Sequence, residues 1–270
     1  SGGGNSIITS SYATGNVIAP RASSTRIGGL VGFLEGLTVS NSYAMGVVGG
    51  GSRIGGLVGE SVGVNNAVNA LITNSYARGP ISVAAGASHI GGLIGMSSVV
   101  NFGVDNSAAG SYWNMATTGQ STSAGGATGL STSAMKSESS FNGWDISGGG
   151  GEASVWRMYE GVSAPLLRTF MQDVEVTVSS ISRAYDRTNS AVVSGVSFSE
   201  TVAGINLTSG QFASANVGTD IAITPSYSAD SGKILHRELQ RYDFVDHNIT
   251  GTITPIALSA TVAAADKAYN

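Results

Sequence analysis

The 270-residue sequence is long enough for one large or two ordinary domains, and 11% of its residues are charged, against about 25% in typical soluble domains. A net charge of −4 argues against a basic nucleic-acid-binding surface, so we predict no nucleic-acid partner. The sequence has no cysteine, which excludes disulfides and thiolate sites, and no apolar run of about 18 residues that would predict a membrane-spanning helix.

Two sequence motifs alternate through the first part of the chain. Ser-Tyr-Ala-x-Gly occurs at 11–15, 42–46 and 75–79, with a degenerate copy at 111–115. Ile-Gly-Gly-Leu-(Val/Ile)-Gly occurs at 27–32, 54–59 and 90–95. Repetition at a period of 20–50 residues is typical of solenoids and other repeat architectures.

The repeat favours short strands over helices, because an interior glycine destabilises a helix by about 1 kcal/mol. We predict a right-handed parallel β-solenoid over residues 1–117, with coils about 4.8 Å apart. Each coil is expected to have three strands: one at each motif and one in the return between them. Equivalent residues should then stack in columns: Ile27, Ile54 and Ile90; Leu30, Leu57 and Leu93; Tyr12, Tyr43, Tyr76 and Tyr112.

Residues 118–170 are predicted to form a cap and connector for the solenoid. The exposed edge at a solenoid end needs covering, and large aromatic side chains suit that role. The three tryptophans of the chain, Trp113, Trp144 and Trp156, lie in or beside this segment.

The rest of the chain has a different composition. Of the 39 glycines, 31 lie in residues 1–150 and 8 in residues 151–270, whereas 12 of the 17 acidic residues lie in 151–270. Alternating polar and apolar residues, as in Val174–Val178 and Leu258–Val262, predict short half-buried strands. We therefore predict a small all-β module over residues 171–256 and the truncated start of a further module at 257–270.

The two motifs at this spacing resemble the GLUG-type repeats of large bacterial surface proteins, which are similar to filamentous-haemagglutinin-like adhesins exported by two-partner secretion. Residues 112–168 also resemble the segment that closes such repeat blocks, with matching features at Phe141-x-Gly-Trp144-Asp145 and Pro165–Arg168. The resemblance implies a secreted or cell-surface location and an outer-membrane secretion partner.

The module after residue 170 resembles the YDG domain. Ser182-Arg-Ala-Tyr-Asp-Arg-Thr188 is similar to its Tyr-Asp-Gly signature, with Arg187 standing where that family has glycine. Ala265-Asp-Lys-Ala-Tyr-Asn270 resembles the opening of a second copy, 84 residues after Tyr185. The resemblance implies YDG-like modules in series.

We predict no catalytic residue, metal site or cofactor. His-Glu-x-x-His does not occur in the sequence, and Gly-x-Ser-x-Gly occurs once, at Gly59–Gly63 within the repeats. A polysaccharide-cleaving solenoid would need two carboxylates at one subsite. The first 117 residues contain Glu35, Glu60 and Asp105, and the two glutamates fall at different positions of their coils. Such an enzyme remains the less favoured alternative.

A basic residue precedes each Ile-Gly-Gly: Arg26, Arg53 and His89. Stacked in a solenoid, they would form a basic column, with Arg78 near it. A column of like charges is unfavourable unless water or an anion screens it. The column is therefore either a solvated edge or a track for an acidic polysaccharide. The tyrosine column could likewise stack on sugars, although packing is the commoner role of a repeated tyrosine.

The sequence thus predicts a non-enzymatic structural and binding segment of an adhesin. Its coils would form a rigid shaft, with weak multivalent contacts to exopolysaccharide or to host or bacterial surface glycans. The alternative is a self-assembling extracellular filament subunit, in which residues 258–270 complete the sheet of a neighbouring copy.

Overall fold

A computed structural model describes residues 7–21, 23–63, 70–99 and 107–263. The described chain consists mainly of β-strands, which confirms the all-β class. It divides into two compact units, Ser1–Met171 and Gln172–Asn270. Among the described residues, no helix is long and apolar enough to cross a membrane. The sequence that resembles the opening of a second module, 265–270, lies outside the described residues.

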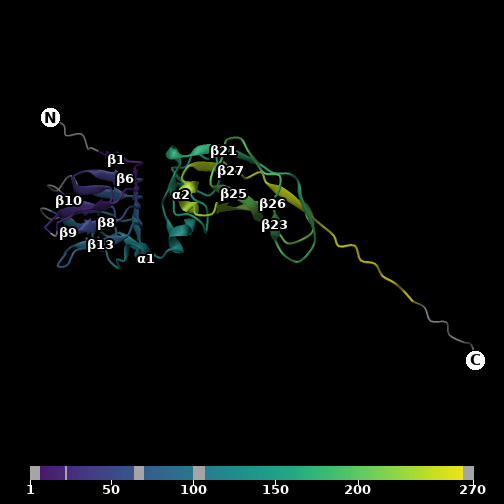
Figure 1. Cartoon of the computed structure of the whole chain (residues 1–270), viewed down its shortest axis with the longest axis horizontal. Helices are drawn as coiled ribbons and strands as arrows, with labels where there is room; N and C mark the ends of the chain where they lie inside the picture. The colour runs from purple at the N-terminus through teal and green to yellow at the C-terminus, as the bar shows by residue number, and fades with distance from the viewer. Residues whose placement is uncertain (1–6, 22, 64–69, 100–106, 264–270) are drawn as a thin grey trace, which may run out of the picture. The chain divides into compact units, whose positions relative to one another are not determined.

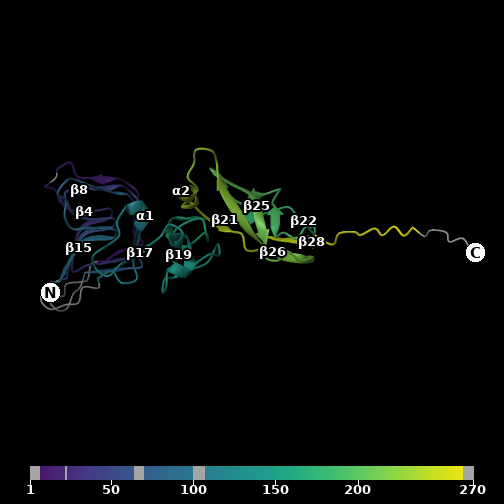
Figure 2. The ribbon, with the colours of Figure 1, turned by 90° about the horizontal axis from the view of Figure 1, so that it is seen from below.

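The first unit begins with three stacked coils of short strands, which Figures 1 and 2 show one beside the next. The first coil contains β1 (Ile7–Thr9), β2 (Tyr12–Ala13), β3 (Val17–Ile18), β4 (Thr25–Gly28) and β5 (Val31–Glu35). The second contains β6 (Thr38–Ser40), β7 (Tyr43–Ala44), β8 (Val48–Gly50), β9 (Ser52–Gly55) and β10 (Val58–Gly63). The third contains β11 (Leu71–Thr73), β12 (Tyr76–Ala77), β13 (Ile81–Val83), β14 (Ile90–Gly91) and β15 (Ile94–Val99).

Equivalent strands of successive coils pair in parallel and form five narrow sheets. Tyr12 pairs with Tyr43 and Tyr43 with Tyr76, while Ile27 pairs with Ile54 and Ile54 with Ile90. The Leu column is aligned as well, because the Leu30 amide donates to the Leu57 carbonyl and the Leu57 amide to the Leu93 carbonyl. We call this arrangement the coil stack; its parallel sheets are consistent with the predicted solenoid.

The prediction of three strands per coil is wrong: the described coils have five. Ile-Gly-Gly-Leu-Val-Gly does not form one strand, because β9 ends at Gly55 and β10 begins at Val58. The motif turns a corner where neighbouring coils approach closely. A Cβ on Gly56 would lie 2.3 Å from the Gly92 carbonyl oxygen of the next coil, and one on Gly59 would lie 2.5 Å from the Ile27 nitrogen of the preceding coil.

Each coil also has two corners at which a residue other than glycine adopts a left-handed backbone. One corner precedes the Ser-Tyr-Ala motif and is formed by Ser10, Asn41 and Asn74, with φ of 46–47°. The other precedes Ile-Gly and is formed by Arg26, Arg53 and His89, with φ of 65°, 53° and 57°. Asparagine tolerates this conformation, whereas arginine adopts it at a cost of about 1–2 kcal/mol.

The interior of the coil stack is apolar, with a ladder of serines at one corner. Its fully buried side chains include Leu34, Val39, Leu57, Ile72 and Leu93. Ser42, Ser75 and Ser111 are also fully buried. Each of these hydroxyl oxygens accepts the amide of the equivalent serine in the preceding coil, at 3.2 Å from Ser11, 3.1 Å from Ser42 and 3.2 Å from Ser75. The serine hydroxyls thus supply acceptors for backbone amides at a corner where the sheets do not.

The far end of the coil stack is covered by residues 112–130, which form an incomplete fourth coil. They comprise β16 (Tyr112–Asn114), the helix α1 (Met115–Thr118) and β17 (Thr128–Leu130), and these two strands extend the sheet of β12. The Ser123 hydroxyl accepts the amides of Leu93 at 3.2 Å and Ile94 at 2.8 Å. Residues 112–130 therefore occupy the place of the next coil.

The following residues do not cover an end; they run back along the side of the coil stack. This returning segment, residues 131–171, contains short 3-10 helices and two-residue strands. Its elements are η1 (Ala134–Lys136), η2 (Glu138–Ser140), β18 (Ile146–Ser147), β19 (Trp156–Arg157), β20 (Leu166–Leu167) and η3 (Arg168–Phe170). Within the segment predicted as cap and connector, 118–170, only the first residues thus lie at the end of the coil stack, and the rest contact its side.

The described part of the C-terminal unit contains two sheets and one helix. One sheet has the order β24-β21-β27 and the other β22-β28-β26-β25-β23. The strands are β21 (Gln172–Thr177), β22 (Ile181–Ala184), β23 (Ser190–Val192), β24 (Ser197–Phe198), β25 (Ile205–Phe212), β26 (Gly218–Ala229), β27 (Tyr242–Val245) and β28 (Thr250–Thr254), and the helix is α2 (Leu235–Leu239). Inward-facing Val174 and Phe244 are fully buried and pair in register.

The strand expected at Leu258–Val262 is absent, because residues 255–263 have no strand partner. Leu258 and Val262 are 94% and 89% exposed. Their alternation has the pattern of a half-buried strand, but the described residues provide no sheet to cover the apolar face. The strand predicted from the same pattern at Val174–Val178 overlaps β21.

Candidate binding face of the coil stack

The basic residues before each Ile-Gly-Gly lie at one corner of the coil stack, which we call the basic corner. Arg26, Arg53 and His89 follow each other on successive coils, because Arg26 lies in β4, Arg53 in β9 and His89 directly before β14, and these strands pair in register. The Arg26 and Arg53 side chains are 46% and 33% exposed. The corner thus presents cationic groups to solvent at intervals of one coil.

A buried carboxylate joins the two arginines. Glu60 Oε2 accepts a hydrogen bond from Arg26 Nε at 2.5 Å and from Arg53 Nη1 at 3.0 Å. The Glu60 side chain is only 6% exposed, so the arginines supply the charge and hydrogen bonds that a buried carboxylate requires. Two guanidinium groups share one carboxylate, which leaves this pair of coils with an excess positive charge.

An apolar surface lies beside the arginines. The Arg26 guanidinium carbon lies 4.2 Å from the centroid of the Phe33 ring, in cation–π geometry. Phe33, Glu60 and Met96 are equivalent positions of β5, β10 and β15. Glu60 is therefore the carboxylate member of an otherwise apolar column, and Phe33 is 36% exposed beside the cations.

His89 continues the basic corner on the third coil, where no carboxylate of the described residues forms an ion pair with it. The position equivalent to Glu60 there is Met96. The His89 ring nitrogen Nδ1 lies 3.2 Å from the Ser88 hydroxyl, and Ser88 in turn donates to the Ser52 hydroxyl at 3.2 Å. Hydroxyl groups and an exposed imidazole thus extend the polar surface of this corner.

Arg78 does not join the basic corner. It directly follows β12, and its amide donates to the Ala44 carbonyl of the preceding coil. Its charge acts on Tyr76, whose pKa it lowers against larger opposing effects. Arg78 thus follows a strand of the tyrosine sheet, whereas Arg26 and Arg53 belong to the sheet of β4, β9 and β14.

The stacked tyrosines form a ladder that the returning segment covers. The rings of Tyr12 and Tyr43 stack with centroids 5.2 Å apart, and those of Tyr43 and Tyr76 with centroids 5.0 Å apart. Aromatic residues of the returning segment contact the ladder in reverse order along the chain: Phe141 and Trp144 at Tyr112, Trp144 and Trp156 at Tyr76, Trp156 at Tyr43, and Phe170 at Tyr12. The rings of Tyr43 and Tyr76, buried between their neighbours and Trp156, have no free face for stacking on a sugar, whereas Tyr12 at the end of the ladder is 40% exposed.

Burial also changes the chemistry of the ladder. Tyr76 is fully buried, and its hydroxyl donates to the Pro165 carbonyl oxygen at 2.7 Å. Burial raises the pKa of Tyr76 well above its ordinary value, and neighbouring Tyr43 raises it further. Burial likewise raises the pKa of Tyr112. The neutral phenol is therefore the form that fits this site.

The carboxylates of the coils do not share one subsite among the described residues. Glu35 pairs in register with Val62, whereas Glu60 pairs with Phe33. Glu35 is exposed at the end of β5, and Glu60 is held by two arginines. Asp105 lies outside the described residues. We found no group of three His, Asp or Glu side chains placed to hold a metal within the described ranges.

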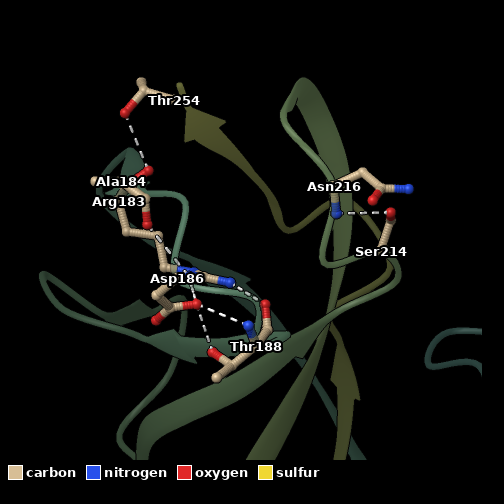
Figure 3. Close-up of polar contacts among 7 residues, drawn as sticks. All are labelled: Arg183, Ala184, Asp186, Thr188, Ser214, Asn216 and Thr254. Carbon is tan, nitrogen blue, oxygen red and sulfur yellow. Dashed lines mark hydrogen bonds and ion pairs between the residues drawn. The ribbon is translucent and has the colours of Figure 1, made fainter. Parts of the chain in front are cut away.

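In the C-terminal unit, the sequence similar to the Tyr-Asp-Gly signature forms a tight turn. Figure 3 shows Asp186 Oδ1 contacting Arg183 and accepting the amide and the hydroxyl of Thr188, both at 2.8 Å. These hydrogen bonds, chiefly the one from the Thr188 amide, lower the pKa of Asp186. Arg187 adopts the left-handed conformation, with φ of 70°, at the position where the YDG signature has glycine.

Sequence reasoning missed the role of Glu60. The signal that could have identified it is the residue that follows each Ile-Gly-Gly-Leu-(Val/Ile)-Gly motif: Phe33, Glu60 and Met96. A single carboxylate in an apolar column, near two arginines at repeat positions, indicates a bridging ion pair. Comparison with protein families, curated proteins and solved structures finds no match for this chain.

Proposed function

We propose that this chain is a non-enzymatic structural and binding segment of a secreted or cell-surface bacterial adhesin. Its coil stack would be a right-handed solenoid of GLUG-type repeats that serves as a stiff shaft. The C-terminal unit would be a YDG-like module. Right-handed winding is supported by the general rule that about 98% of parallel crossover connections are right-handed. Export through an outer-membrane secretion partner belongs to the same proposal.

The observation that carries the binding role is the basic corner. Three consecutive coils present a cation or an imidazole at one position, and the single carboxylate of Glu60 leaves positive charge in excess over Arg26 and Arg53. Equatorial hydroxyls and carboxylates of an acidic polysaccharide could contact this row, with the sugar ring against Phe33. Each contact would be weak, and repetition along the polymer would supply avidity.

Stiffness is supported by the pairing of the coils. The second coil has hydrogen-bonded neighbours on both sides in all five sheets, and the serine and tyrosine ladders add side-chain contacts between coils. In repeat proteins of this kind, nearest-neighbour interfaces supply most of the stability. A shaft built in this way resists bending because bending would break several ladders together.

The binding role can be tested with columns carrying polygalacturonate, dextran sulfate or neutral dextran. We expect retention on both anionic polymers that falls with added salt, and no retention on dextran. Arg26→Ala combined with Arg53→Ala and Glu60→Gln should reduce retention, with Glu60 neutralised so that no buried carboxylate is left unpaired. Glu60→Gln alone should increase retention, because it removes the shared negative charge while keeping both arginines.

Equal retention of all three proteins would contradict the proposed role of the basic corner. Reducing ends released from polygalacturonate would instead favour the polysaccharide-cleaving alternative. The Glu60→Gln protein serves as the matched control for folding, because it shares the neutralised carboxylate with the triple variant.

A second candidate function is a self-assembling filament subunit, and it is favoured by the exposed C-terminal segment. Leu258 and Val262 alternate with small or polar residues and are almost fully exposed. Residues 258–270 would complete the sheet of a neighbouring copy. Concentration-dependent polymers in electron micrographs would support this function, and polymers that persist after deletion of 258–270 would contradict it.

A further inference from the structure

The first coil of the stack has an open face. Each of its strands, β1 to β5, lies at the edge of its sheet, whereas every strand of the second coil has a neighbour on both sides. Val17 is 38% exposed, while its partner Val48 in the second coil is fully buried. Among the described residues, the open face therefore presents strand edges without a partner together with apolar side chains, a combination that favours pairing with another strand.

The glycine of the Ser-Tyr-Ala-x-Gly motif shows what fits on this face. A Cβ on Gly46 would lie 1.9 Å from the Gly15 carbonyl oxygen, and a Cβ on Gly79 would lie 1.9 Å from the Gly46 carbonyl oxygen. Glycine is thus required where the preceding coil places its own carbonyl. At Gly15 a Cβ would meet no described atom within 4 Å, and its φ is not in the left-handed region. Nothing among the described residues explains glycine at position 15.

The serine ladder also indicates what fits on the open face. Ser42 and Ser75 donate their hydroxyl hydrogens within their own coils, to the carbonyls of Ser40 and Thr73, and accept an amide from the preceding coil. Ser11 donates to the Thr9 carbonyl at 2.8 Å in the same way. Its hydroxyl oxygen is therefore oriented to accept an amide from the open side, although no described residue supplies one.

We propose that the open face is a docking surface for one more β-coil of the same repeat, stacked in parallel register on β1 to β5. A coil with a Ser-Tyr-Ala-x-Gly motif would place its glycine carbonyl against Gly15 and its serine amide on the Ser11 hydroxyl. Its tyrosine would extend the ladder beyond Tyr12, which is 40% exposed. This inference does not depend on the proposed glycan contact.

A second copy of this chain fits the face less well. At the opposite end of the coil stack, residues 112–130 extend the tyrosine sheet and contact Leu93 and Ile94, so a copy cannot stack there in register on all five sheets. Only the open face of the copy remains, and two open faces in contact would bring equivalent strands together in opposite directions. The carbonyl-to-glycine and amide-to-serine contacts require the parallel direction.

The test is an extended full-length chain with a second copy of residues 7–37 inserted directly before Ile7. The junction then repeats the natural connection between Leu37 and Thr38, because Ile7 and Thr38 are equivalent positions. The amides of Tyr43 and Met45 donate to the first coil, so the amides of Tyr12 and Thr14 face the open side. We expect hydrogen exchange at Tyr12 and Thr14 to slow by at least about tenfold in the extended chain.

Two variants make the test specific. Gly15→Val should leave the melting temperature of the unextended chain within about 2 °C, because its Cβ meets open space. In the extended chain, Val at the original position 15 would meet the new carbonyl, and the protection of Tyr12 and Thr14 should be lost. A chain extended by a scrambled 31-residue segment should show no protection.

Several results would overturn the proposal. One is unchanged exchange at Tyr12 and Thr14 in the extended chain, and another is equal protection in the Gly15→Val version. Failure of the coil-extended chain to fold, when the scrambled extension folds, would also contradict it. Protection of both amides in the unextended chain that grows with concentration would show that a second copy occupies the face.

Discussion

The coil stack and the C-terminal unit are both built from short strands, but they fix the register of those strands in different ways. In the coil stack, each residue is positioned by an equivalent residue in the next coil, as in the tyrosine and serine ladders. In the C-terminal unit, β21 and β25 alternate buried and exposed residues around a conventional core. The coil stack therefore tolerates no added side-chain volume where the backbones of neighbouring coils meet. In the C-terminal unit, the strand register depends on which face of each strand is buried.

The largest difference between the two regions is expected when one methyl group is added to a glycine in each. Gly56→Ala would place a Cβ 2.3 Å from the Gly92 carbonyl oxygen, so the coils must separate. We expect a loss of at least about 4 kcal/mol in the free energy of unfolding of the first unit. Fluorescence-detected denaturation reports on that unit alone, because all three tryptophans lie in it.

The matched substitution in the C-terminal unit is Gly218→Ala, whose new Cβ has its nearest neighbour at 3.4 Å, on Ile221. We expect a change within about 1 kcal/mol, measured by hydrogen exchange of the β25 and β26 amides. Similar losses from the two substitutions would show that close backbone approach does not distinguish the regions.

The next largest effect concerns the aromatic contacts between the coil stack and the returning segment. Trp156 is fully buried and lies 6.1 Å, between ring centroids, from both Tyr43 and Tyr76. Trp156→Ala should destabilise the first unit by about 3–5 kcal/mol. Phe170→Ala, at the 48% exposed end of the same row, should cost about 1 kcal/mol. Thermal denaturation of both proteins would measure the difference, and equal losses would contradict a continuous ladder.

A smaller effect is expected from the buried hydroxyl of Tyr76. Tyr76→Phe removes its hydrogen bond to Pro165 and should cost about 1 kcal/mol near neutral pH. Because folding raises the pKa of Tyr76, its contribution is complete below the unfolded value near pH 10 and decreases as the pH rises above it. Urea denaturation from pH 8 to 11 should show a weaker alkaline loss for the variant. An identical pH dependence in both proteins would contradict the burial of this phenol.

The smallest effects come from placing glycine at the left-handed corners of the two regions. Arg187→Gly should stabilise the C-terminal unit by up to about 1 kcal/mol, because glycine relieves the backbone cost while Asp186 and Thr188 keep the turn. Arg53→Gly has the same backbone effect, but it also removes one partner of buried Glu60 and should destabilise the first unit. Denaturation curves that shift in the same direction for both variants would contradict the role of Glu60.

The repeat predicted the columns of the coil stack but not the path of each coil. Identical residues at Tyr43 and Tyr76, or at Ile54 and Ile90, specify which positions stack. The corners at Gly55–Gly56 and Arg53 depend on backbone contacts with the neighbouring coils, and hydrophobic pattern alone does not encode such contacts. The five-strand path could therefore not be obtained from alternation or composition.

The covering of the tyrosine ladder was beyond sequence reasoning for another reason. Trp144 and Trp156 are spaced by loops, and no periodicity indicates whether they cover the end of the coil stack or its side. Their contacts with Tyr112, Tyr76 and Tyr43 are long-range and follow the reverse order of the repeats.

The segment Leu258–Val262 shows a related limit of sequence patterns. Its alternation indicates strand propensity, but a strand forms only where the edge of another strand is present to pair with it.

Parallel, in-register stacking of the coils is the central claim, and a pair of introduced cysteines tests it most directly. The chain has no cysteine of its own, and the hydroxyls of Thr9 and Ser40 lie 3.0 Å apart on adjacent coils. We predict that Thr9→Cys with Ser40→Cys forms an intramolecular disulfide readily under mild oxidation. The control pair Ile7→Cys with Ser40→Cys is displaced by two residues and should remain reduced. Equal or preferential crosslinking of the control pair would contradict the in-register stack.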